Sequence, residues 1–203
     1  MSSQSPKKVI AAFDFDYTLV KTDSFQALLK QNFGIVKFSL SIILYFFYIL
    51  LFLVKIVKPQ TLKRKFFSHF FKGMNEKKYK EKCSNFSFDF IPEHLIEDAK
   101  KKLEWHKKQG HTLVIISASL EDWIKPWAIQ NGFNEVFATI PEVKNGKITG
   151  NFKSKNCRWQ EKVNRLINTY PDRDSYYLYA YGDSSGDKEL LEFADESFYR
   201  KYE

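Results

Sequence analysis

Two apolar stretches that lie far apart in the chain each end in a pair of aspartates. The first, Val9 to Phe13, is followed by Asp14 and Asp16, and the second, Tyr176 to Tyr181, is followed by GDSSGD. A short continuous apolar run of this kind is typical of a parallel strand that is buried on both faces. Ligands of open α/β sheets collect at the carboxyl ends of the strands. The sequence therefore predicts a parallel sheet that brings both aspartate pairs to one edge.

The segments between these two runs alternate as an α/β fold requires. A third apolar run spans Leu113 to Ile116, and apolar residues recur at helical spacing from Pro92 to Gln109. A further helix is predicted from Cys157 to Thr169. Asn145-Gly146 stands between short alternating segments and predicts a β-hairpin within Pro141 to Phe152. The alternation of strands and helices predicts a three-layer, Rossmann-like α/β core around a parallel sheet.

Length and composition limit the chain to one core with a small insertion. A chain of 203 residues can bury one substantial core but not two large independent ones. The α/β pattern stops between residues 34 and 90, so we expect a core of residues 1–33 and 91–203 and a helical cap of residues 34–90. The two cysteines allow no disulfide framework and MSSQSPKK carries no secretory signal, so a reducing, cytoplasmic setting is expected.

The expected cap combines an apolar run with a strongly basic segment. Phe38 to Val54 is a run of seventeen residues without a charge, flanked by Lys37 and Lys55. From Lys55 to Lys82 there are ten Lys or Arg residues against two Glu residues, a net charge of +8 that equals that of the whole chain. Apolar side chains beside basic ones are typical of segments that lie on an anionic membrane surface.

The order of motifs limits how the apolar run can meet a membrane. The run is at the short end of the length that crosses a bilayer. Asp14 precedes it and Asp183 follows it, so a single crossing would separate residues that must meet. We therefore expect a helix or short helical hairpin in one leaflet, peripheral or monotopic on the cytosolic face, with an ordinary buried cap helix as the alternative. No nucleic-acid partner is expected, because the paired Phe residues of LKRKFFSHFF recur as on an apolar helix face.

The aspartates suit phosphate chemistry. Of two carboxylates spaced like Asp14 and Asp16, one can attack or bind a metal while the other donates and accepts a proton. Together with the aspartates of GDSSGD they could hold Mg²⁺, which prefers a few carboxylate or carbonyl oxygens plus water and substrate phosphate. Taken singly, each group could merely cap a solvated turn. Their combination at the ends of two strands favours a site.

Hydroxyl and cationic groups lie at two further places in the pattern. Ser117, at the end of the middle strand, could donate to a phosphate oxygen, and Ser119 could cap the next helix. Lys155, Arg158 and Lys162 lie near the start of the helix after the hairpin. A cation there would neutralise the charge that develops on a transferred phosphoryl group.

In this order the motifs resemble those of the haloacid dehalogenase superfamily of phosphatases. DFDYTLVKTDSF resembles its nucleophile motif, ISAS its second motif, NCRWQEKVNRL its lysine motif and YGDSSGDKELL its metal motif. The resemblance spans Val9 to about Ser197. Within the superfamily it is greatest to the phosphoserine-phosphatase-like branch, subfamily IB, and specifically to the phosphatidylglycerophosphatase C type.

The resemblance implies a role for each carboxylate. Asp14 would be the nucleophile that forms an aspartyl-phosphate, and Asp16 would be the general acid and base. Asp183 would bind Mg²⁺ beside Asp14 and the backbone carbonyl of Asp16. Asp187 would support this metal site.

The resemblance also implies how phosphate is held. Thr18 and Ser117 would bind phosphate or orient the carboxylates. Lys162 would clamp the phosphate, with Arg158 as the competing alignment. Tyr17 stands where the superfamily often has glycine.

These features predict a Mg²⁺-dependent phosphomonoesterase that acts on a membrane lipid phosphate, with phosphatidylglycerol phosphate favoured by the resemblance. A covalent carboxyl-phosphate intermediate would divide a very slow hydrolysis into two easier steps. One alternative is a phosphatase of a small soluble metabolite such as phosphoserine. Another is a catalytically silent membrane-binding module in which Tyr17 blocks the site.

Overall fold

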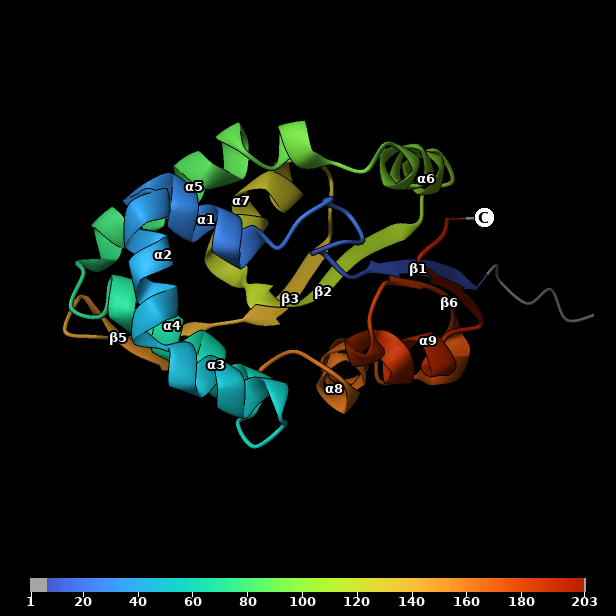
Figure 1. The fold of residues 1–203 in the computed structure, drawn as a ribbon. Coiled ribbons are helices and arrows are strands. Elements are labelled where there is room, and N and C mark those ends of the chain that lie inside the picture. Colours follow the sequence, from blue (N-terminus) through green and yellow to red (C-terminus); the bar gives the residue numbers. More distant parts are fainter. Residues whose placement is uncertain (1–6, 203) are drawn as a thin grey trace, which may run out of the picture.

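A five-stranded parallel sheet forms the centre of the protein (Figure 1). The computed structural model describes residues 7–202, so residues 1–6, on which the expectation of no secretory signal partly depends, lie outside it. The three apolar runs that the sequence predicts as strands are confirmed as the three central strands, in the order β3-β2-β1-β6-β7. The strands are β1 (Lys8–Phe13), β2 (Thr112–Leu120), β3 (Glu135–Thr139), β6 (Tyr176–Gly182) and β7 (Glu196–Tyr199).

Helices cover both faces of this sheet. Figure 1 shows α6 (Glu97–Lys108) on one side and α8 (Gln160–Thr169) and α9 (Lys188–Phe193) on the other. Successive side chains of a strand point to opposite faces. Ala11 and Phe13 accordingly pack in one cluster with Leu103 of α6, whereas Ile10 and Ala12 pack with Leu166 of α8. Both faces are buried, which explains the continuous apolar strands and confirms the three-layer α/β fold.

Residues 34–90 form four helices between β1 and the rest of the core. A single hydrophobic cluster joins these helices to the core and contains Phe67 and Phe71 of the insertion as well as Trp123 of the core. Helix α5 packs against α7 of the core. The helices of this region are α1 (Ser24–Phe33), which precedes the insertion, α2 (Ile35–Leu44), α3 (Phe46–Leu53), α4 (Pro59–Phe71), α5 (Glu76–Asp89), and α7 (Glu121–Gln130) of the core.

The uncharged run of the insertion divides into two consecutive helices, α2 and α3, with a break at Tyr45. No side chain of α3 is buried. Among residues 7–202 we find no individual helix whose length and apolar character would carry it across a membrane. Helices α1 and α2 reach that length and composition only together, and the chain bends by 117° between them.

The predicted hairpin is confirmed as β4 (Pro141–Lys144) and β5 (Lys147–Phe152). Asn145 and Gly146 both have positive φ, 50° and 69°, as a two-residue I′ turn requires. The hairpin is attached to the insertion, because the Gly73 N–H donates to the Ile148 carbonyl at 2.8 Å.

Two predicted helices are shorter than the sequence pattern suggests. The stretch from Pro92 to Gln109 is divided into a 3₁₀ turn, Pro92–His94, and helix α6, Glu97–Lys108. The helix is interrupted between them because the Ile96 N–H donates to the Leu19 carbonyl at 2.9 Å. The helix expected from Cys157 begins instead at Gln160. Trp159 precedes it with φ of 55°, which a right-handed helix does not allow.

Candidate active site

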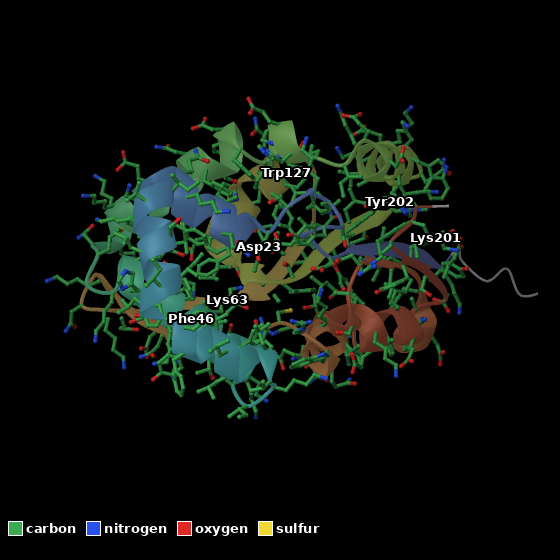
Figure 2. The ribbon with its side chains drawn as sticks, in the orientation of Figure 1. Asp23, Phe46, Lys63, Trp127, Lys201 and Tyr202 are labelled. Carbon is green, nitrogen blue, oxygen red and sulfur yellow. The ribbon has the colours of Figure 1, made fainter. Side chains whose placement is uncertain are left out.

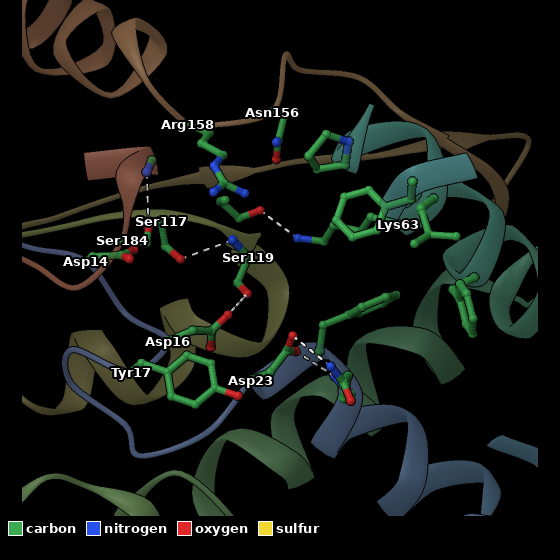
Figure 3. Close-up of a pocket in the computed structure, with 18 of the residues that line it drawn as sticks. Asp14, Asp16, Tyr17, Asp23, Lys63, Ser117, Ser119, Asn156, Arg158 and Ser184 are labelled. Carbon is green, nitrogen blue, oxygen red and sulfur yellow. Dashed lines mark hydrogen bonds between the residues drawn. The ribbon is translucent and has the colours of Figure 1, made fainter. Parts of the chain in front are cut away.

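A cavity of about 620 Å³ lies at the carboxyl ends of β1, β2 and β6, between the core and the insertion. Figure 3 shows its polar end, where Asp14 and Asp16 lie near Ser117 and Ser119. Lys63 of the insertion and Asp23, which precedes α1, also line it and are labelled in Figure 2. The remaining wall is apolar and consists of Phe25, Leu29, Phe38, Ile42, Ile49, Phe52, Leu53, Pro59, Leu62 and Phe66.

Lys162 joins the aspartates from two strands. Its Nζ lies 2.8 Å from Asp14 Oδ1 and 2.5 Å from Asp187 Oδ1, and all three side chains are buried. Burial alone would lower the pKa of Lys162, but the carboxylates of Asp14 and Asp187 raise it above its ordinary value. Lys162 is therefore held as a cation beside Asp14. Arg158, the competing alignment, lines the cavity without an ion pair among the described residues.

Asp14, Asp183 and Asp187 form a group of carboxylates whose oxygens lie within 4.8 Å of one another. Burial, opposed by Lys162 and reinforced by Asp187, raises the pKa of Asp14 to about 7. Burial and the charge of Asp187 also raise the pKa of Asp183. One lysine does not balance three carboxylates, so a divalent cation would relieve the excess negative charge. Clustered carboxylate oxygens are the donor set that Mg²⁺ prefers.

Asp187 is fixed in this group by its own loop. Its Oδ2 accepts hydrogen bonds from the Ser184 N–H at 3.0 Å and the Ser184 hydroxyl at 2.9 Å. Burial would raise the pKa of Asp187, but Lys162 and these hydrogen bonds hold it below its usual value. Gly182 leaves room for the close approach, since a Cβ there would lie 2.5 Å from Asp187 Cβ. The GDSSGD sequence thus forms a preorganised support for an ionised carboxylate.

The Asp16 side chain lies outside this carboxylate group. Its Oδ1 accepts from the Ser24 N–H at 2.9 Å and its Oδ2 from the Ser119 hydroxyl at 2.5 Å. Burial and the charge of Asp23 raise the pKa of Asp16 to about 6, against hydrogen bonds from Ser119 and Ser24 that lower it. Such a pKa suits a residue that gives and takes a proton near neutrality. A metal contact of Asp16 would have to use its backbone carbonyl, as the family resemblance implies.

The loop after β1 determines where Tyr17 and Thr18 lie relative to the cavity. Tyr17 has φ of 56°, a conformation that glycine adopts without strain, and its side chain is 54% exposed at the rim of the cavity. Thr18 does not line the cavity, so its placement does not favour the phosphate contact expected from sequence. Its hydroxyl is buried without a hydrogen-bond partner among residues 7–202, and its carbonyl accepts a hydrogen bond from the Tyr202 hydroxyl.

Ser117 and Ser119 lie two residues apart near the carboxyl end of β2, where the pairing of β2 with β3 is irregular. Both line the cavity, and the Ser117 hydroxyl accepts from the Ser119 N–H at 3.0 Å. The Ser119 hydroxyl donates to Asp16 instead of capping α7, whose first turn has no side-chain cap. Ala118 between them lines the cavity too, so strand alternation alone does not explain why both serines face it.

Sequence reasoning missed several polar cavity residues, among them Lys63, Asn156 and Asp23. Lys63 comes from α4, and its Nζ donates to the Ala118 carbonyl at 2.6 Å, between the two serines of β2 (Figure 3). Asn156 lies just before Arg158 and accepts a weak hydrogen bond from Thr139 at 3.3 Å. Lys63 is one of ten basic residues in its segment, and nothing in the sequence distinguishes it.

Known proteins place this site in a family. A family model for haloacid dehalogenase-like hydrolases matches residues 11–192. "Protein CicA" of Caulobacter vibrioides is 32% identical over 199 residues, covering 95% of this chain and 86% of CicA. A Bordetella pertussis Tohama I protein of unknown function has a similar structure, with TM-score 0.82 and 20% identity over 95% of this chain and 90% of that one.

Phosphoserine phosphatase has the same fold. A structure of its phospho-aspartyl intermediate analogue aligns with TM-score 0.64 and 18% identity, covering 95% of this chain and 86% of that one. A phosphoserine phosphohydrolase-like protein from Francisella tularensis aligns with TM-score 0.65 and 22% identity over the same shares. The matched residues contain Asp14, Asp16, Ser117, Lys162 and Asp183. The chain belongs to the haloacid dehalogenase-like hydrolases.

Proposed function

We propose that this phosphatase depends on Mg²⁺ and acts on a membrane lipid with a terminal phosphate, and that phosphatidylglycerol phosphate is the leading candidate. The observation that carries the proposal is the division of the cavity into a carboxylate end and an apolar end. A substrate with a phosphate head and a hydrocarbon tail matches this division. Phosphoserine, the substrate in the name of the phosphoserine phosphatase structures, has no apolar part that the apolar end of the cavity could bind. The resemblance to the phosphatidylglycerophosphatase C type supports the same substrate.

A membrane surface is the proposed partner, and the outer side of α2 and α3 supports it. Their exposed apolar side chains include Ile43, Phe46 and Phe47, between 57% and 71% exposed. Burying one such side chain contributes about 1.5–3 kcal/mol, and each nearby Lys or Arg adds about 1 kcal/mol at an anionic surface. Ile42 and Leu53 are exposed yet also line the cavity. The cavity therefore borders the surface that would meet the lipid.

The proposed reaction uses this chain's own residues in two steps. A carboxylate oxygen of Asp14 attacks phosphorus, and the bond from phosphorus to the leaving alcohol oxygen breaks as that oxygen takes a proton from Asp16. Water then attacks the phosphorus of the aspartyl-phosphate, giving a proton to Asp16 and releasing phosphate and the Asp14 carboxylate. Lys162 neutralises charge beside Asp14 in both steps. Mg²⁺, held by Asp14, Asp183 and Asp187, would supply further positive charge to the phosphate oxygens.

Phosphate release from two substrates tests the proposal. Phosphatidylglycerol phosphate in mixed micelles is compared with phosphoserine, each with Mg²⁺ and with EDTA. We expect preference for the lipid and loss of turnover in EDTA. Preference for phosphoserine would contradict the lipid assignment, and full activity in EDTA would contradict the metal dependence.

A further inference from the structure

Lys63 is a cation placed where the polar and apolar ends of the cavity meet. It comes from α4 of the insertion, while the residues that hold Asp14 and Asp16 come from the core. Its Nζ donates to the Ala118 carbonyl at 2.6 Å and lies 5.5 Å from the ring of Phe25, which belongs to the apolar wall. The ammonium therefore stands beside the serines of β2 but at the edge of the hydrocarbon-lined space.

No carboxylate of residues 7–202 forms an ion pair with Lys63. An ammonium group has three N–H donors, and the Ala118 carbonyl accepts one of them. Lys63 is half-buried, and desolvating a charge without a partner is costly. Burial accordingly lowers the pKa of Lys63 to about 8, although the charges of Asp16 and Asp23 oppose this effect. An anion in the cavity would remove the cost.

The terminal phosphate of a substrate does not account for this cation. That phosphate must lie at Asp14, where Lys162 already provides a paired positive charge. Arg158 lines the same end and has a buried Nε without an acceptor in the described part of the chain. Lys63 differs from both because it extends from the insertion and borders Phe25. Its position suits a second anionic group, between the reacting phosphate and the apolar tail.

We propose that Lys63 is a specificity residue that binds an internal phosphodiester of the substrate. The substrate class is then a lipid whose head group carries a terminal phosphomonoester and is joined to its apolar part through a second phosphate. This inference rests on the proposed function and narrows it. A lipid in which the only phosphate is attached directly to the acylated glycerol, such as phosphatidic acid, leaves Lys63 unpaired when its phosphate reaches Asp14.

The test compares two lipids with identical acyl chains. We measure kcat/KM for phosphatidylglycerol phosphate and for phosphatidic acid in the same mixed micelles with Mg²⁺, using wild type, Lys63→Met, Lys63→Arg and the control Lys65→Met. Lys65 is on the same helix but lies 3.8 Å from the Tyr48 ring and outside the cavity. Thermal unfolding of each variant verifies that the fold is retained.

We expect Lys63→Met to lower kcat/KM for phosphatidylglycerol phosphate by about ten- to a hundredfold, as expected for loss of a charge-assisted hydrogen bond. Turnover of phosphatidic acid should stay within about twofold, Lys63→Arg should retain the discrimination, and Lys65→Met should change neither substrate. Equal losses for both lipids, or none, would overturn the role of Lys63. Wild-type preference for phosphatidic acid would also overturn the role of Lys63 but would agree with a lipid substrate. Turnover of phosphoserine and of neither lipid would overturn both the role of Lys63 and the proposed lipid substrate.

Discussion

The Nζ of Lys162 lies 2.8 Å from Oδ1 of Asp14, although the two residues come from segments 148 positions apart in the chain. The contact forms because β1 and β6 are neighbours and α8 packs beneath them. It places a permanent cation beside the proposed nucleophile and beside Asp187. One lysine therefore faces several carboxylates in this site.

Replacing Lys162 should impair both catalysis and folding. Lys162→Met leaves Asp14 and Asp187 without their shared cation, so we expect kcat to fall by at least about 10². The free energy of unfolding should fall by about 3–5 kcal/mol, as for other buried pairs that lose one partner. Lys188→Met is the control, since its side chain is 69% exposed and lies 3.7 Å from Glu192. Urea unfolding of both variants measures the difference, and an equal change in the two would contradict the assigned role.

Ser119 should set the pH range of Asp16. Ser119→Ala removes a hydrogen bond that stabilises the ionised carboxylate, so the pKa of Asp16 should rise from about 6. In the proposed reaction the first step needs protonated Asp16, so kcat/KM should decline as pH rises through this pKa. The decline should move to higher pH in the variant. Ser175→Ala, whose hydroxyl bonds an exposed carbonyl elsewhere, is the control. An unchanged pH profile in Ser119→Ala would show that this hydrogen bond does not tune the acid.

Without metal, the protein should lose stability as pH rises from about 4 to 7. Burial raises the pKa of Asp14 in the folded state to about 7 from 3.8, so the folded state binds the proton more tightly than the unfolded state. The stabilising contribution is complete below the unfolded pKa and is lost as pH rises through the folded one, on the order of 4 kcal/mol for this shift. Urea unfolding in EDTA at several pH values measures it. Asp14→Asn should flatten the dependence, and an unchanged slope in that variant would rule out Asp14 as its source.

The exposed face of α3 should control binding to anionic vesicles. Phe47→Glu places a charge on a side chain position that is 67% exposed and outside the cavity, so vesicle binding should drop severalfold while turnover of a soluble phosphomonoester persists. Ile129→Glu makes the same kind of change at a position on α7 that is 64% exposed. Vesicle flotation of the two variants gives the comparison. Equal binding by both would exclude α3 as the membrane-facing surface.

Most polar residues of the candidate site could be predicted from the sequence because they directly follow strands. The apolar runs that became β1, β2 and β6 each end in polar residues, and parallel strands bring such ends together. The hairpin was predictable from Asn145-Gly146, because few residues adopt the positive φ values that its turn requires. Local chemistry was sufficient in each of these cases.

The rest depended on long-range packing. Ser24, eight residues after Asp16, donates its backbone N–H to that carboxylate, and backbone donors leave no mark in a sequence. Lys63 of α4 donates to the Ala118 carbonyl across 55 positions of sequence, a contact that exists only in the folded chain. Thr18 follows the nucleophile motif but is turned into the protein interior, since the loop with Tyr17 at positive φ redirects the chain.

The most direct test of the central claim is a search for the phosphoryl-enzyme. Wild type and Asp16→Asn are mixed with substrate and Mg²⁺, quenched in acid and digested, and the peptides are examined by mass spectrometry. Asp16 acts in both proposed steps, so Asp16→Asn should form the intermediate more slowly and also lose it more slowly, and wild type quenched during the first turnover is the main sample. We expect a phosphoryl group on the peptide that contains Asp14 and none on that peptide in Asp14→Asn. Turnover by Asp14→Asn, or a phosphoryl group on another residue, would contradict the central claim.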